Sequence, residues 1–171
     1  MGLKNNVYIF LLISLTMSCV TPVKVLQTDK QSVNNLLDTW HQDVANFKYV
    51  AYFEKMTDDA VFVGTDALEV WNKQQFMVFS KPYFDKKQTW DFKPLQRNIY
   101  FDASGKMAWF DEVLDTWMGL SRGSGVLVLT KNGWKIKHYV LSVTVPNEDI
   151  KSVIEAKKET EKTQIQKFVK Q

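Results

Sequence analysis

The sequence predicts an α+β fold in which N-terminal helices pack on a strongly curved antiparallel sheet. Two observations carry this prediction. Apolar residues recur at helical spacing over residues 33–47, and from Thr89 onward the pattern changes to long strands whose side chains alternate between two faces. Helices that come first in the chain, followed by an antiparallel sheet, are typical of the α+β class.

The N-terminus is typical of an exported protein. Lys4 precedes an apolar run over residues 7–17, which is too short to cross a bilayer as a helix and indicates a signal peptide over residues 1–19. A small residue before Cys19, with a leucine a few positions upstream, resembles a bacterial lipoprotein processing site. We therefore predict an exported lipoprotein of the cell envelope that a lipidated Cys19 anchors to a membrane.

Cys19 is the only cysteine of the chain, and a simple signal peptide or a buried thiol stay open as alternatives. Lipidation would leave the mature domain without a thiol for a disulfide, a metal or a nucleophile. Residues 20–27 are predicted to form a tether, residues 28–146 the domain and residues 147–171 a charged C-terminal helix. The domain is long enough for one core and too short for two.

Three helices are predicted before the sheet. Thr28 and Gln31 have capping-box spacing. The helix that they begin has one apolar face, made by Val33, Leu36, Leu37, Trp40, Val44 and Phe47. A second, short helix is expected over residues 49–56 and a short strand over residues 60–64, and Asn72 is expected to cap the third helix.

Three turn signals set the expected register of the sheet. The Asn-Gly turn predicts that Leu127 pairs with His138. The Met-Gly turn before it predicts that Glu112 pairs with Gly125, and the Ser-Gly turn at the start of the sheet predicts that Arg97 pairs with Glu112.

These registers collect one set of apolar side chains on a single face, which must be the core. The set comprises Leu95, Ile99, Phe101, Phe110, Leu114, Leu127, Leu129, Trp134 and Ile136. The same alternation puts Arg97, Glu112 and His138 on the buried face, where the small Gly125 leaves room beside Glu112.

Three ionisable side chains on an apolar surface need partners, because an unpaired buried charge is strongly destabilising. In one interpretation, Arg97 and Glu112 form an ion pair that closes the core. In another, Glu112 or His138 moves a proton while Arg97 orients an anionic or carbonyl group. In a third, the same residues bind a ligand without chemistry.

Five further residues are candidates for ligand binding. Trp40, Trp71 and Phe110 are core or pocket-wall residues, and His41 lies at the edge of the first apolar helix face, where it either completes the packing or reaches the pocket mouth. Asp66 follows a Gly-Thr turn and is either a general base or a turn-forming residue. We expect no metal and no cofactor, because two histidines are few for a zinc site and no phosphate-binding glycine loop is present.

The outer face of the predicted sheet is apolar with a charged rim and is too large to leave in water. It comprises Trp109, Val113, Trp117, Val126, Val128, Tyr139, Leu141 and Val143. We expect a homodimer through this face, the alternative being that the C-terminal helix covers it. The net charge of +3 comes from lysines interspersed with acidic residues, so nucleic acid is not expected as a partner.

Several motifs together resemble the nuclear transport factor 2-like superfamily, specifically its bacterial SnoaL-like branch. They are Trp40-His41, residues 62–66 (FVGTD), Glu69-x-Trp71, residues 81–84 (KPYF), residues 108–112 (AWFDE), residues 122–127 (RGSGVL), residues 134–136 (WKI) and residues 145–147 (VPN). The resemblance implies a cone-shaped fold, a pocket between helices and sheet, and dimerisation through the outer sheet face. It covers cyclases, isomerases, dehydratases and non-catalytic binding domains, so it does not fix the function.

Relatives in this branch often carry a histidine in the last strand where this chain has Val140, and here the histidine is His138. We predict an exported SnoaL-like domain that binds a small, partly apolar ligand in its cone without chemistry. One alternative is a cyclase-, isomerase- or hydrolase-type enzyme that uses Glu112 or His138 for proton transfer, and another is a protein-interaction module of an envelope complex. An enzyme should keep its pocket open near Glu112, whereas a scaffold should fill it with side chains.

Overall fold

The computed structural model of the chain describes residues 27–170, which form four α-helices and six strands. The helices are α1 (Gln27–Ala45), α2 (Tyr49–Glu54), α3 (Lys73–Asp85) and α4 (Ile150–Val169), and a short 3-10 turn, η1 (Asn147–Asp149), precedes α4. The strands are β1 (Met56–Val63), β2 (Val70–Asn72), β3 (Lys93–Phe101), β4 (Met107–Thr116), β5 (Gly119–Thr130) and β6 (Gly133–Val143). Within residues 27–170, no helix is long and apolar enough to cross a membrane.

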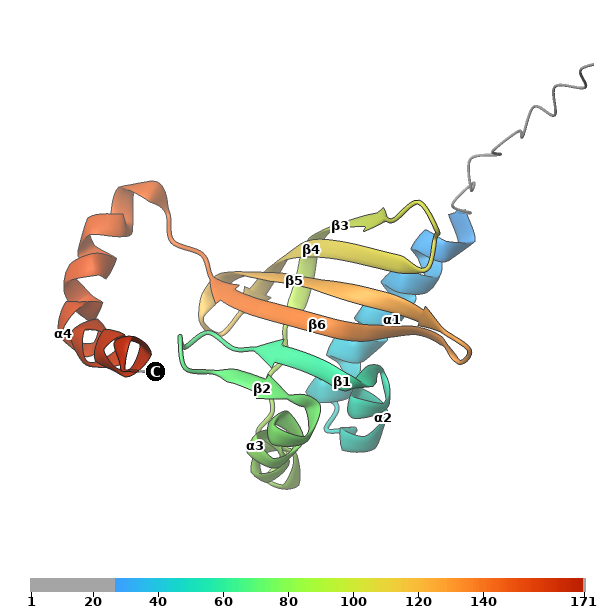
Figure 1. Cartoon of the computed structure of the whole chain (residues 1–171), viewed down its shortest axis with the longest axis horizontal. Coiled ribbons are helices and arrows are strands. Elements are labelled where there is room, and N and C mark those ends of the chain that lie inside the picture. Colours follow the sequence, from blue (N-terminus) through green and yellow to red (C-terminus); the bar gives the residue numbers. More distant parts are fainter. Residues whose placement is uncertain (1–26, 171) are drawn as a thin grey trace, which may run out of the picture.

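The strands form one curved, open sheet in the order β2-β1-β6-β5-β4-β3. Figure 1 shows them side by side with α1 running behind and α3 at the β2 end. The α+β prediction is confirmed, with helices on one face of the sheet. One neighbouring pair, β1 with β6, is parallel, whereas the other four neighbouring pairs are antiparallel.

Helix α3 begins at a local sequence signal. Asn72 caps α3 as predicted, since its side chain accepts a hydrogen bond from the backbone of Gln75, whose side chain in turn bonds the backbone of Asn72. The predicted apolar face of α1 is buried at Val33, Leu37, Trp40 and Val44. Phe47 does not belong to it: this residue lies beyond α1 with a φ of 60° and is exposed.

In the β4–β5 and β5–β6 hairpins, the observed strand pairing is shifted by two residues from the predicted register. The structure pairs Glu112 with Gly123 rather than Gly125, and Leu127 with Ile136 rather than His138. In each hairpin the glycine follows the two-residue loop and adopts a positive φ, 85° at Gly119 and 94° at Gly133. The sequence prediction assumed that Asn132 and Gly133 occupy the two central turn positions. In the structure, Lys131 and Asn132 occupy them instead. The predicted pairing of Arg97 with Glu112 is confirmed.

A bulge in β6 changes which face its polar residues occupy. Between the pairs Val126–His138 and Leu127–Ile136, β6 carries one extra residue. Tyr139, instead of His138, consequently lies on the buried face of the sheet, and the prediction that His138 faces the core is wrong. Leu141 follows Tyr139 onto the same inner face, so both leave the predicted outer surface.

The core lies between α1, α2, α3 and the concave sheet face. From the predicted core set, Ile99, Phe110, Leu114, Leu127, Trp134 and Ile136 are buried. Leu95 and Leu129 are exposed instead: Leu95 is the extra residue in a β3 irregularity between Pro94 and Gln96, and Leu129 lies close to the end of the β5–β6 hairpin.

After β6 the chain leaves the sheet, and α4 then runs so that its C-terminal end lies near the β1–β2 turn (Figure 1). None of the residues of α4 is buried. The side-chain amide of Gln164, on α4, donates hydrogen bonds to the two carboxylate oxygens of Asp66 at 2.9 and 3.2 Å. Several lysine–glutamate pairs three or four residues apart run along the helix. The helix is therefore held mainly by its own backbone and these exposed pairs.

Candidate functional site

A buried polar cluster is centred on Glu112, in the middle of β4. Its carboxylate has no solvent exposure, and three donors surround it. His41 Nε2, from α1, lies 2.8 Å from Oε1, and the Tyr139 hydroxyl donates to the same oxygen at 3.2 Å. Arg97 Nε, from β3, donates to Oε2 at 2.8 Å. One carboxylate thus joins a helix and three strands.

Arg97 extends this cluster to the surface. Its side chain is 6% exposed, and its Nη1 lies 2.7 Å from the half-exposed carboxylate of Asp38 and 3.2 Å from the side-chain oxygen of Asn34, both on α1. The guanidinium is therefore shared between a buried and a partly solvated carboxylate, which balances its charge.

Gly123 makes the space in which this cluster closes. It pairs with Glu112 across β4 and β5. A Cβ at this position would overlap the Tyr139 hydroxyl and lie 2.8 Å from Glu112 Oε1. Gly125, to which the sequence analysis gave this role, instead makes room for the Phe110 ring and the His138 carbonyl.

Two shifts in pKa follow from this arrangement. Burial by itself would raise the pKa of Glu112, but the hydrogen bond and charge of His41 together with Arg97 outweigh burial and hold that pKa below its usual value. Burial, followed by the charge of Glu112, raises the pKa of Tyr139 well above its usual value. The cluster accordingly holds an ionised carboxylate beside a neutral phenol.

The cluster is closed to small molecules on the sheet side. Aromatic rings cover it: Trp40 packs edge-on against Tyr139 at 4.8 Å, and Phe110 stacks beside Tyr139 at 6.1 Å. His41 also lines a polar cavity formed by α1 and the start of β3. We call this the α1 cavity; it is lined by Asp38, His41, Gln42, Ala45, Asn46, Asp91, Phe92, Lys93 and Pro94.

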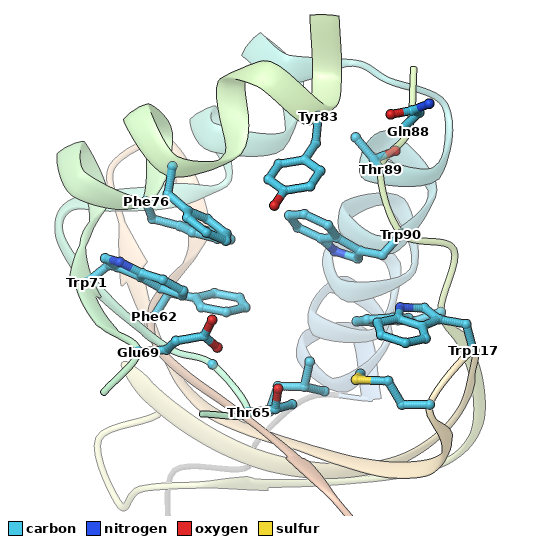
Figure 2. A pocket seen from close by; sticks show the side chains of 15 residues that line it. Phe62, Thr65, Glu69, Trp71, Phe76, Tyr83, Gln88, Thr89, Trp90 and Trp117 are labelled. Atoms are coloured by element: carbon cyan, nitrogen blue, oxygen red, sulfur yellow. The ribbon is translucent and has the colours of Figure 1, made fainter. Parts of the chain in front are cut away.

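A second cavity, of about 330 Å³, lies between α3, the β1–β2 turn and the two loops that carry Trp90 and Trp117. We call it the aromatic pocket. Its eight aromatic side chains are Phe62, Trp71, Phe76, Phe79, Tyr83, Trp90, Phe92 and Trp117. In Figure 2 the Tyr83 hydroxyl points into the space between Trp71 on one side and Trp90 and Trp117 on the other. This volume and this apolar lining are typical of small-molecule sites.

Stacked rings build the wall of the aromatic pocket on the α3 side. Trp71 stacks on Phe79 with ring centroids 4.4 Å apart, and Phe62 stacks on Phe76 at 4.0 Å. Phe76 is buried in the core, whereas Phe79 is exposed. The wall is therefore anchored in the core and open at one end.

Glu69 supplies the one carboxylate of the aromatic pocket, and Figure 2 shows it pointing into the cavity. The backbone N–H of Asp66 donates to Oε2 at 3.2 Å. Gly64 makes room for this side chain, because a Cβ there would overlap Oε2. Asp66 itself accepts from the backbone of Leu68 at 2.8 Å, which is the turn-forming role that the sequence left open.

The structure separates the predicted site residues into three places. Arg97, Glu112 and His41 meet in the buried cluster. Trp71 lines the aromatic pocket, whereas Trp40 and Phe110 are buried in the core and line neither cavity.

Two further predicted residues lie outside the buried cluster, the aromatic pocket and the core. His138 is half-buried and pairs with Val126 on the outer side of the sheet, and Asp66 is exposed in the β1–β2 turn. Cys19 lies outside the described residues, as do the predicted signal peptide and most of the tether.

Sequence reasoning missed most of the pocket lining. Tyr83 and Phe79 come from a helix that the sequence did predict, and their spacing of four residues was a usable signal for one helix face. Glu69 belongs to the Glu69-x-Trp71 motif, but the sequence analysis assigned no function to it. Trp90 lies in a loop, where no periodicity marks the direction of a side chain. Trp117 was predicted on the outer sheet face, and that prediction is wrong: it lies in the two-residue β4–β5 turn, where strand alternation ends, and it lines the aromatic pocket.

Within residues 27–170, no group of three or more His, Cys, Asp or Glu side chains is placed to hold a metal ion. The described residues at the two cavities include aromatic rings, the Glu69 carboxylate and the His41–Glu112 pair, which can bind a ligand or move a proton.

Comparison with known proteins assigns the fold. The family model of the SnoaL-like domain matches residues 33–146. None of the curated proteins compared with the chain matches it.

Solved structures with this fold are remote in sequence. A proposed aromatic ring hydroxylase from Novosphingobium aromaticivorans is 17% identical, with a TM-score of 0.60 over 70% of this chain and 91% of that one. A domain of unknown function with a cystatin-like fold from Nostoc punctiforme is 12% identical, with a TM-score of 0.61 over 85% and 99%. A proposed scytalone dehydratase from N. aromaticivorans is 9% identical, with a TM-score of 0.59 over 69% and 85%. At these identities the likeness concerns the fold alone.

Proposed function

Because the chain belongs to the SnoaL-like domain family, we propose that it is a binding domain that takes a small, partly apolar molecule into the aromatic pocket and leaves it chemically unchanged. One observation carries this proposal: a cavity of about 330 Å³ is lined by eight aromatic side chains, of which Phe79, Tyr83 and Trp117 are exposed to solvent. Buried aromatic area is the largest source of affinity in sites of this kind.

The position of the ionised cluster supports binding rather than chemistry. An enzyme that used Glu112 would need its carboxylate beside the ligand, but Glu112 has no solvent exposure and does not line the aromatic pocket. Its four neighbours, Arg97, His41, Tyr139 and Gly123, account for the space and charge around it. The ion pair is thus proposed to close the core, as one interpretation of the sequence held.

Isothermal titration of the purified protein with 3-tert-butylphenol, a small neutral aromatic probe, tests this function. Phe79→Ala removes a ring that stacks on Trp71 in the aromatic pocket, and we expect it to weaken binding by about tenfold. Val78→Ala is the matched control, because Val78 precedes it on α3, is exposed and does not line the aromatic pocket. Equal binding by both variants would reject the aromatic pocket as the site.

A second candidate function, proton transfer, is favoured by the His41–Glu112 pair. A carboxylate that accepts a hydrogen bond from a histidine ring orients that histidine, and His41 lines the polar α1 cavity. The histidine beside Glu112 is His41, not His138, which the sequence analysis had placed on the buried face. Turnover of carbonyl substrates that disappears in His41→Gln, with binding to the aromatic pocket unchanged, would favour the enzyme.

We also propose that the protein is exported and anchored to a membrane through a lipid on Cys19, with the domain held by a tether. The support is the charged, apolar and small-residue pattern before Cys19. Metabolic labelling with a palmitate analogue tests it: the label should enter the wild type and be absent from Cys19→Ser.

A homodimer through the outer sheet face is proposed on the exposed apolar residues there. Trp109 is 44% exposed and stacks on the exposed Tyr100 of β3 at 5.8 Å. Such a patch fits a two-fold contact, and an envelope partner is the alternative occupant. Sedimentation of wild type and Trp109→Lys tests it, with dissociation expected in the variant and a concentration-independent monomer contradicting the dimer.

A further inference from the structure

We propose that the ligand of the aromatic pocket is an organic cation, that is, an ammonium group carried on a small apolar or aromatic body. This inference rests on the proposed binding function and names the charge of its ligand. Three features of the pocket support it: the charge of the lining, the placement of Glu69 and the stacked rings that face the cavity.

The lining of the aromatic pocket is negative. Glu69 is its one charged residue, and none of the described lining residues is lysine, arginine or histidine. This contrasts with the chain as a whole, which has 22 lysines and arginines and a net charge of +3. A carboxylate in an apolar cavity attracts a cation more strongly than it would in water, and it repels an anion.

Glu69 has no cationic partner among the residues that the structure describes. Its neighbour in the turn is a backbone amide, which donates to Oε2 at 3.2 Å. The two buried carboxylates differ from the half-buried Glu69: Glu112 is paired with Arg97, and Asp43 with Lys55. A ligand cation would give Glu69 the counterion that these two carboxylates find within the protein.

The fold keeps this carboxylate at the pocket wall. Gly64 has no side chain, and its N–H donates to the carbonyl of Glu69 at 2.8 Å, which closes the β1–β2 turn. A Cβ at Gly64 would overlap Oε2 of Glu69 and push the carboxylate aside. The glycine therefore positions a charge as well as a turn.

Aromatic rings provide the second element of cation recognition. Trp71 lies beside Glu69 in the lining, and Trp90 and Trp117 lie across the cavity from it (Figure 2). The faces of tryptophan rings attract ammonium groups, and several rings around one cavity form the aromatic cage that quaternary ammonium ligands occupy. Carboxylate and rings together fit a cation better than a neutral molecule of the same shape.

The test uses two probes of the same shape and different charge, (3-hydroxyphenyl)trimethylammonium and 3-tert-butylphenol, titrated calorimetrically into the purified protein. We expect the cation to bind about tenfold more tightly. Glu69→Gln should remove most of this preference and leave the neutral probe unaffected, because the glutamine oxygen still accepts from Asp66. Asp66→Asn is the matched control: this neighbouring carboxylate does not line the aromatic pocket, and the preference should persist.

Gly64→Ala gives an independent variant that keeps the charge but displaces it, and it should weaken the cation more than the neutral probe. Equal affinities of the two probes in the wild type would overturn the cation inference and leave the binding function standing. A preference that survives Glu69→Gln, or that Asp66→Asn abolishes equally, would also overturn it. If neither probe binds, the binding function fails together with the inference.

Discussion

The His41 imidazole lies 2.8 Å from the Glu112 carboxylate, although 71 residues separate them in the chain. This contact fastens α1 to the middle of the sheet. Arg97 completes it from the neighbouring strand, so that a single buried charge is balanced from two elements. A buried carboxylate of this kind is stable only while its donors stay in place.

Glu112→Gln should therefore lower the free energy of unfolding by about 3–5 kcal/mol, because it leaves the Arg97 charge without its buried counterion. Denaturant unfolding measures this difference. Asp115→Asn, an exposed change on the same strand, is the control and should be close to neutral. Equal stability of wild type and Glu112→Gln would contradict a structural ion pair.

The same carboxylate predicts a dependence of stability on pH. Its pKa is lower in the folded protein than the ordinary value of 4.5, since the donation and charge of His41, together with Arg97, outweigh burial. Its stabilising contribution is complete above the ordinary value and is lost as the pH falls through the lower, folded value. The difference in stability between wild type and Glu112→Gln should thus shrink on acidification. A difference that grows in acid would contradict this sign.

Gly123→Ala should destabilise the protein by about 1–3 kcal/mol, because the new methyl group overlaps the Tyr139 hydroxyl. Tyr139→Phe removes that oxygen, and Gly123→Ala should cost less in its background. A double-mutant cycle on unfolding free energies measures the coupling. If the effects of the two substitutions on the unfolding free energy were strictly additive, the added methyl group would not clash with the Tyr139 hydroxyl.

Gly133→Ala should cost about 1–2 kcal/mol through backbone strain alone, because φ is 94° there and nothing lies within 4 Å of a Cβ. Gly133→Asn should cost less, since asparagine tolerates positive φ better. Thermal unfolding of both variants tests the turn, and an alanine variant as stable as wild type would contradict the observed backbone.

The fold could be predicted because hydrophobic period and element order suffice for it. Arg97 and Glu112 could also be paired, because the Ser-Gly turn sets a register that stays regular as far as these two residues. His138 could not be placed: alternation assumes an uninterrupted strand, and one extra residue in β6 exchanges it with Tyr139. The extra residue, Lys137, is not of a type that predicts a bulge.

The aromatic pocket was less predictable than the cluster for another reason. Its walls come from a helix, a turn and two loops that meet only in the folded chain. The sequence predicts Trp71 as a core or pocket-wall residue, but the position of Glu69, two residues earlier, depends on the space that Gly64 leaves across the turn. Pockets assembled from loop residues leave no periodic signal in a sequence.

The most direct test of the central claim, that the aromatic pocket is the ligand site, is ¹⁹F NMR of protein labelled with 5-fluorotryptophan and titrated with 3-tert-butylphenol. Three of the six tryptophans, Trp71, Trp90 and Trp117, line the aromatic pocket, while Trp40, Trp109 and Trp134 do not. Resonances are assigned by single Trp→Phe substitutions. We expect the resonances of Trp71, Trp90 and Trp117 to shift with one dissociation constant, while those of the other three tryptophans stay in place. Shifts confined to Trp109 or the core tryptophans, or no saturable shift at all, would contradict it.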